Sequence, residues 1–226
     1  MKTMSAAARW TLVASVIAGV SYGASWGLHP PPAVATLWKG SGVALLAAHA
    51  ALRARSLDGW LLVGVMALGA AGDVLLETSG LTAGAIAFLL GHLVATGLYL
   101  RHRRRASRIP LALIPIVPTI AFFLPADRSA APGVAFYSLF LAVMAATALT
   151  SHFPRKMVGR GVLMFVLSDL LIFARLGPPP SGLLVSLAVW GLYYFGQMMI
   201  CVGVARTLNP RVFSDEVAPI RRQKMR

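Results

Sequence analysis

Long apolar segments alternate with short polar connections along most of the chain, and each apolar segment is close to the length that crosses a bilayer. A hydrocarbon core of about 30 Å is spanned by about 20 helical residues. The connections are rich in proline, glycine or charged residues, which end helices. The pattern therefore predicts eight transmembrane helices, over residues 10–28, 34–52, 60–76, 81–100, 109–124, 133–149, 158–176 and 182–205.

This arrangement is that of an all-α membrane protein, a bundle of about eight helices. A single transmembrane domain covers residues 1–208, and residues 209–226 form a basic tail that we expect to lie against anionic lipid headgroups. Pro110, Pro115 and Pro118 should kink the fifth helix. An alternative for the first segment is a signal peptide, because two basic residues precede an apolar run that ends in small residues. Its removal would leave seven helices.

The basic residues support eight crossings and set the expected orientation. With the N-terminus inside, the cytoplasmic segments hold 18 of the 21 lysines and arginines, and Lys39, Arg128 and Arg175 lie on the other side. Cytoplasmic loops carry such an excess, so both termini should be cytoplasmic, in a cytoplasmic membrane of the bacterial type. The segregation also argues against nucleic acid as a partner, despite the net charge of +14, because a nucleic-acid site gathers its cations on one polar face.

The composition excludes a soluble globular domain. Hydrophobic residues make up 58% of the chain and charged residues 12%, against about 25% charged residues in soluble domains. Cys201 is the only cysteine, so it can form no intramolecular disulfide, and we expect it to be a small apolar packing residue.

Two acidic residues stand inside the predicted membrane segments. Asp73 lies in Gly-Asp-Val-Leu-Leu-Glu and Asp169 in Leu-Ser-Asp-Leu-Leu. An acid at bilayer depth is costly, which favours a functional role for both. Asp73 and Glu77 share one helix face a turn apart, and Glu77 is either a solvated helix end or part of the site. Arg175 lies too far around its helix to pair with Asp169, so we expect that acid to have a partner on another helix.

The segments around the two aspartates are similar and lie four predicted helices apart. A parallel duplication of four plus four helices would explain this and could bring the two acids face to face.

Other polar residues fall between the bilayer midplane and the non-cytoplasmic face, which predicts a polar cavity in that half of the bundle. Tyr193 and Tyr194 lean toward opposite faces of the last helix, so one of them should face the cavity, and Gln197 favours Tyr193. A zinc-dependent hydrolase would need about three ligands, and His92 alone of the five histidines is well placed. We therefore expect no metal and no cofactor. The cavity should contain Lys39, Asp73, Glu77, His92, Asp169, Arg175, Tyr193, Tyr194 and Gln197.

Five pieces of the sequence stand in a fixed order, namely Lys39, Gly-Asp-Val-Leu-Leu at 72–76, Phe-Leu-Leu-Gly-His at 88–92, Phe-Val-Leu-Ser-Asp at 165–169 and Tyr-Tyr-Phe-Gly-Gln at 193–197. Together they resemble the lysoplasmalogenases of the YhhN-like membrane proteins. The chain departs from the family pattern at Gly40, where a proline is common, and at Tyr99, which stands later than the tyrosine usual after the glycine-histidine pair. The resemblance covers most of the chain from Lys39 to Gly203.

The resemblance implies an eight-helix membrane hydrolase that cleaves the vinyl ether of lysoplasmalogens, giving a fatty aldehyde and a glycerophospho-choline or -ethanolamine. The reaction starts with protonation of the alkene carbon by a neutral carboxylic acid, and a second carboxylate stabilises the cation that forms. Asp73 and Asp169 are the expected catalytic pair, with either one as the acid.

The same resemblance implies a lysophospholipid substrate surrounded by membrane lipids. Lys39, His92 and Arg175 are candidates for the phosphate or for orienting an acid. Tyr194 and Gln197 could contact the glycerol or the water. Glu77 and Tyr193 complete the predicted substrate site.

Two other classes of function remain open at this point. A small-solute or lipid transporter would use buried acids and a repeat for proton coupling, and a lipid-binding protein would have no turnover. The oligomeric state is open as well.

Overall fold

The computed structural model describes residues 5–104, 108–177 and 182–209, and the regular structure within these ranges is helical apart from one isolated antiparallel bridge between Arg103 and Ser151. The predicted basic tail lies outside the described residues, except for Asn209. The helical elements are α1 (Ala6–Ser21), η1 (Tyr22–Ala24), α2 (Ser25–Leu28), α3 (Pro32–Arg53), α4 (Leu57–Thr78), α5 (Leu81–Arg101), η2 (Ile109–Ala112), α6 (Leu113–Phe123), α7 (Ala131–Leu149), η3 (Arg155–Gly159), α8 (Arg160–Ala174) and α9 (Leu183–Leu208).

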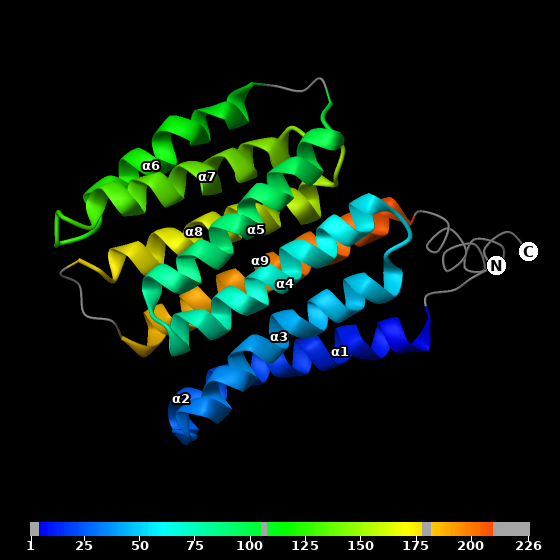
Figure 1. Cartoon of the computed structure of the whole chain (residues 1–226), viewed down its shortest axis with the longest axis horizontal. Coiled ribbons are helices and arrows are strands. Elements are labelled where there is room, and N and C mark those ends of the chain that lie inside the picture. The colour runs from blue at the N-terminus through cyan, green and yellow to red at the C-terminus, as the bar shows by residue number, and fades with distance from the viewer. Residues whose placement is uncertain (1–4, 105–107, 178–181, 210–226) are drawn as a thin grey trace, which may run out of the picture.

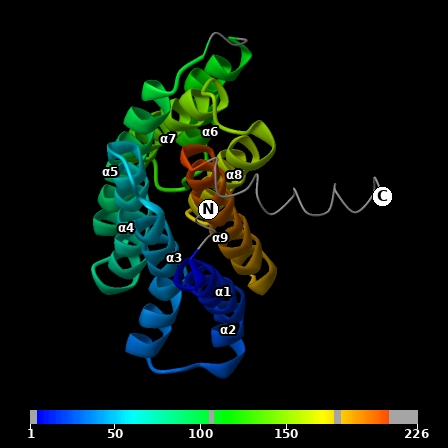
Figure 2. The same ribbon diagram turned by 90° about the vertical axis from the view of Figure 1, so that its right-hand side faces the viewer.

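These elements form eight rods at the eight predicted positions, because α1, η1 and α2 continue one another, as do η2 with α6 and η3 with α8. Rods that follow one another in the sequence run in opposite directions along the long axis of the molecule (Figure 1). Seen from the end, α3, α4 and α5 form one side of the bundle and α8 and α9 the other, with α6 and α7 at one edge and α1 at the opposite edge (Figure 2). The last helix returns to pack against α3 and α4 as well as α8.

Six of the rods are long and apolar enough to cross a membrane. They are residues Ala6–Leu28, Leu57–Thr78, Leu81–Arg101, Ala131–Leu149, Arg155–Ala174 and Leu183–Leu208. The outer surface exposes large apolar side chains, among them Leu37 at 71%, Phe123 at 71% and Leu184 at 81%. A surface of this kind suits lipid rather than water, so the chain has the build of a multi-pass membrane protein.

The two remaining rods differ from the others in composition or length. Helix α3 has 22 residues but carries Lys39, Ser41 and His49 along its length. The fifth rod is broken into the short turn η2 and the 11-residue helix α6, with Pro118 inside the helix. The interruption predicted from the three prolines is therefore present, because proline cannot donate a backbone hydrogen bond.

The beginning of the first rod and the end of the last lie at the same end of the bundle. His49 Nδ1 on α3 lies 2.7 Å from the carbonyl oxygen of Ala8 on α1, and Asn209 Nδ2 donates to the carbonyl oxygen of Arg53 at 3.3 Å. Asp58 at this end binds Arg101 and His102, which joins α4 to the end of α5. The helix ends that carry the basic residues therefore lie at one end of the bundle, as the sequence predicted. The cytoplasmic location of that end stays a prediction.

Two glycines bring α8 and α9 into backbone contact. A Cβ atom on Gly161 would lie 2.7 Å from the carbonyl oxygen of Gly196, and one on Gly196 would lie 2.8 Å from that of Gly161. Side chains larger than hydrogen do not fit at either position without moving a helix. This close approach fixes α8, with Asp169, against α9, with Tyr193.

The first rod is tied into the bundle by polar contacts to two other helices. Ser15 donates to the carbonyl oxygen of Gly42 on α3 at 2.6 Å and lies 3.0 Å from the hydroxyl of Tyr194 on α9. The indole nitrogen of Trp190 donates to the carbonyl oxygen of Gly19 at 2.7 Å. These contacts place Tyr22, the first residue of η1, beside the pocket described next.

Candidate active site

A pocket opens between the α4–α5 and α8–α9 sides of the bundle, at the end away from the contact of Ala8 with His49. Asp73 and Asp169 both line it, together with Lys39, Glu77 and Arg175. Apart from Ser186, apolar and aromatic side chains form the rest of the wall. Two segments 96 residues apart in the sequence thus supply carboxyl groups to one cavity. The sequence predicted that both acids would face a polar cavity inside the bundle.

Asp73 is held near the C-terminal end of α4 and is 2% exposed. The hydroxyl of Tyr193 on α9 donates to its Oδ2 atom at 2.8 Å and also reaches the carbonyl oxygen of Gly69 at 3.4 Å. The preceding residue is glycine because the ring of Phe88 packs there, where a Cβ atom would lie 2.7 Å from it. The Gly-Asp pair therefore lets α5 approach α4 directly beside the acid.

Asp169 is 6% exposed and has its partner on another helix, as expected. The hydroxyl of Tyr137 on α7 donates to its Oδ2 atom at 2.7 Å. Behind this tyrosine, Nε2 of His92 on α5 lies 3.0 Å from the same hydroxyl. Because the tyrosine proton points to the carboxylate, the histidine nitrogen acts as the donor in this arrangement.

The two aspartates have matching surroundings. Each accepts a hydrogen bond from a tyrosine of a different helix, and each tyrosine is backed by a second polar side chain, His92 behind Tyr137 and Gln197 behind Tyr193. Among the described residues, Oδ1 of either acid has no hydrogen-bond partner. One oxygen of each carboxyl group is therefore positioned, and the other is available to a molecule in the pocket.

Both carboxyl groups line the same pocket. The ring of Phe165 on α8 packs beside both tyrosine systems, with its centroid 5.3 Å from that of His92 and 5.4 Å from that of Tyr193. This apolar packing excludes water from the inner side of the two aspartates, so their carboxyl groups are accessible only from the pocket.

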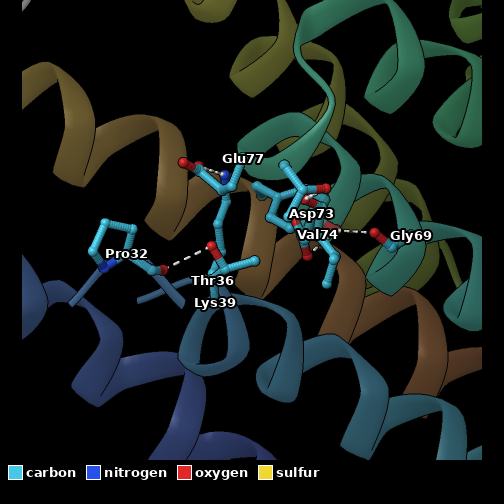
Figure 3. A network of polar contacts seen from close by, with 9 residues as sticks. Pro32, Thr36, Lys39, Gly69, Asp73, Val74 and Glu77 are labelled. Atoms are coloured by element: carbon cyan, nitrogen blue, oxygen red, sulfur yellow. Dashed lines mark hydrogen bonds and ion pairs between the residues drawn. The ribbon is translucent and has the colours of Figure 1, made fainter. Parts of the chain in front are cut away.

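Lys39 and Glu77 form an ion pair at the rim of the pocket. The Nζ–Oε1 distance is 2.7 Å, and the exposed fractions of the side chains are 15% for Lys39 and 45% for Glu77. Figure 3 shows the pair joining α3 to α4, with Asp73 one turn away on α4. Glu77 is thus more than a solvated helix end. The lysine hydrogen-bonds Glu77, and Asp73 takes its hydrogen bond from Tyr193 instead, which argues against a purely structural Lys39–Asp73 pair.

The remaining predicted residues take three different positions. Arg175 caps the end of α8, is exposed and lines the pocket. His92 and Gln197 lie behind the tyrosines and do not belong to the pocket wall. Tyr194 points away from the acids, toward Ser15, and stacks on Trp190 at a centroid distance of 6.0 Å. Of the two adjacent tyrosines, Tyr193 is the one that lines the cavity, as the position of Gln197 indicated.

Sequence reasoning missed the two tryptophans on the aromatic side of the pocket, Trp26 and Trp190. Tyr22, Trp26 and Trp190 all line it, and the ring centroids of Tyr22 and Trp190 are 4.6 Å apart. Tyr137 was visible as a polar residue in the outer half of its helix, but nothing in the sequence connected it with Asp169. Within the described ranges, no three histidine, cysteine or acidic side chains come together as a ligand set for a metal ion.

The fold and the pocket define a membrane-spanning helical bundle with a buried two-carboxylate site. The model of the YhhN family matches residues 34–204, which is most of the chain. The chain belongs to the YhhN family. No curated protein and no solved structure matches it.

Proposed function

We propose that this protein is a membrane-embedded hydrolase that cleaves the vinyl ether bond of lysoplasmalogens, releasing a fatty aldehyde and glycerophospho-ethanolamine or -choline. The observation that carries the proposal is the pair of buried aspartates, each oriented by a tyrosine and each with Oδ1 open to one pocket. Membership of the YhhN family supports it, because that family is associated with hydrolase activity.

The reaction needs two carboxyl groups in different protonation states. A neutral acid adds its proton to the alkene carbon next to the ether carbon, which leaves an oxocarbenium ion. Water then adds to the ether carbon, and the resulting hemiacetal breaks into the aldehyde and the alcohol. One water is consumed, and the proton returns to the pair. A carboxylate beside the cation stabilises it and then takes a proton from the water.

Asp73 and Asp169 can share this work. Two carboxyl groups in one pocket commonly hold one proton between them, as in aspartic proteases, so the acid role belongs to the pair rather than to one residue. Tyr137 and Tyr193 also line the pocket, and their hydrogen bonds to Asp169 and Asp73 position the oxygens of the acids. The phenyl ring of Phe165 keeps bulk water away from the inner side.

The rest of the pocket suits a single-chain phospholipid. Arg175 and Lys39 provide cations for a phosphate at the rim. Leu76, Leu81 and Ile172 give an apolar wall for the alkenyl chain. Along α4, Glu77 lies one turn, about 6 Å, from Asp73, so a head group held at the rim leaves the glycerol and the ether within reach of the acids.

The test is product analysis with the detergent-purified protein. Lysoplasmenylethanolamine should yield fatty aldehyde by mass spectrometry, and an ester lysophospholipid should yield no fatty acid. Asp73→Asn and Asp169→Asn should each lower aldehyde release by roughly 10²–10⁴-fold, the usual contribution of a general acid or base. Asp127→Asn, which removes a carboxylate from the α6–α7 connection at the same end of the bundle, is the matched control.

Folded Asn variants that release aldehyde at the wild-type rate would contradict the proposal. Release of fatty acid from the ester substrate would redirect it to phospholipase chemistry. Substrate-dependent uptake into proteoliposomes without product would favour a transporter.

A further inference from the structure

The rim of the pocket carries two cations and one anion in a specific arrangement. Lys39 and Glu77 pair across α3 and α4, while Arg175 at the end of α8 makes no ion pair with any residue in the described parts of the chain. Glu77 is the most exposed member of the pair, with a side chain 45% accessible. The rim therefore offers a bound anion two cations, but only if the lysine leaves its carboxylate.

An ion pair that is partly exposed to water is easily exchanged for another partner. A ligand with only a negative group would take Lys39 and leave Glu77 unpaired beside that group. A ligand with a phosphodiester and an ammonium group a few bonds apart would satisfy both halves of the pair at once. The charges at the rim are thus complementary to a zwitterionic head group rather than to an anionic one.

We propose that Glu77 is the residue that selects the head group, by receiving the ammonium group of the substrate while Lys39 and Arg175 receive its phosphate. The inference rests on the proposed hydrolase function. A primary ammonium donates charge-assisted hydrogen bonds to a carboxylate, and a trimethylammonium group cannot. Glu77 therefore favours ethanolamine over choline. The rings of Tyr22 and Trp26 line the same pocket and can still bind the trimethylammonium group of choline by cation–π contact.

The experiment compares three substrates with the same alkenyl chain and different head groups: phosphoethanolamine, phosphocholine and a free phosphate monoester. We measure kcat and KM for the wild-type protein and for Glu77→Gln. The variant should lose roughly tenfold or more in kcat/KM for the ethanolamine substrate, through KM, because one hydrogen bond between charged groups is lost. The loss for choline should be smaller, and the phosphate monoester should be cleaved as well as before or better.

Asp127→Asn makes the same change in net charge at the same end of the bundle and should leave the order of the three substrates unchanged. An equal loss for all three substrates in Glu77→Gln would overturn the inference, because it would mean that Glu77 only holds Lys39 in position. A wild-type protein with no preference for ethanolamine would overturn it too.

A binding measurement separates this inference from the proposed function. Isothermal titration of the detergent-purified protein with glycerophosphoethanolamine and with glycerol 3-phosphate reports the head-group site without turnover. If the wild-type protein cleaves no vinyl ether, the proposed hydrolase is wrong, and Glu77-dependent binding of glycerophosphoethanolamine would still support the head-group site. If the protein cleaves the ether and Glu77→Gln binds both compounds as the wild type does, the head-group site alone is wrong.

Discussion

Tyr137 of α7 donates a hydrogen bond of 2.7 Å to Asp169 of α8, and this bond joins two helices that pack less extensively on one another than most neighbours in the bundle. The orientation of the carboxyl group thus depends on one hydroxyl rather than on a tight helix interface. The same relation holds for Tyr193 and Asp73, across α9 and α4.

Tyr137→Phe removes that hydroxyl and keeps the ring, which packs against Phe173 at a centroid distance of 5.6 Å. Aldehyde release should fall roughly 10–100-fold, because a hydrogen bond to a charged group contributes about 1.5–3 kcal/mol. The melting temperature should fall as well, because buried atoms of Asp169 and His92 lose their partner. The check is a rate assay with thermal unfolding of the same preparation. Wild-type activity in the folded variant would mean that Tyr137 does not position Asp169.

Gln197→Met should lower activity near Asp73 without lowering the stability of the protein. The Oε1 atom of Gln197 is buried without a partner among the described residues, whereas its amide group supports Tyr193. Removing an unsatisfied acceptor is expected to leave the melting temperature unchanged or higher. Aldehyde release should nevertheless fall several-fold, roughly the effect of one neutral hydrogen bond, because Tyr193 loses its backing. A loss of stability with unchanged activity would reverse this assignment.

Gly196→Ala should destabilise the protein by about 1–3 kcal/mol, because the new methyl group would meet the carbonyl oxygen of Gly161 and push α8 from α9. Gly191→Ala, on the same helix with nothing within 4 Å of its added Cβ atom, is the matched control. It should be neutral or stabilising by up to about 1 kcal/mol, since alanine is the better helix former. Equal melting temperatures for the two variants would show that the close approach is not needed.

Arg175→Gln and Lys39→Gln should raise KM for the lysophospholipid roughly tenfold each, with a smaller effect on kcat, because a phosphate at the rim loses one charge-assisted hydrogen bond. Arg128→Gln serves as the control. Its side chain lies at the same end of the bundle but donates to the carbonyl oxygen of Phe122 and does not line the pocket. A rise in KM of the same size in all three variants would indicate a general loss of positive charge instead of a phosphate site.

The eight rods could be predicted because each depends on a property that is local in the sequence. An apolar run of bilayer length needs no partner to be recognised, and the prolines that interrupt the fifth rod act on their own backbone. The exceptional cost of an acid in such a run likewise marked Asp73 and Asp169 without knowledge of their neighbours. The proposed internal repeat stays a prediction, as does the side of the membrane on which the termini lie.

The partners of the site residues could not be predicted in the same way. Which helices become neighbours, and how each is rotated about its axis, depends on contacts such as the Gly161–Gly196 approach, and helices that are apolar on all sides carry little sign of the face that turns inward. Tyr194, which the sequence offered as a substrate contact, points to Ser15 instead. Glu77, which the sequence left between two interpretations, is joined to Lys39 of another helix.

The sequence by itself determined that this chain forms a bundle of apolar helices and that two of these helices contain an aspartate. It also marked the two aspartates as functional candidates, because burial of a charge is costly wherever the helix is placed. Only the tertiary structure decided that a tyrosine holds each acid, that the acids share one pocket, and that a lysine–glutamate pair stands at its rim. These are relations between helices, set by how the rods pack and rotate against one another.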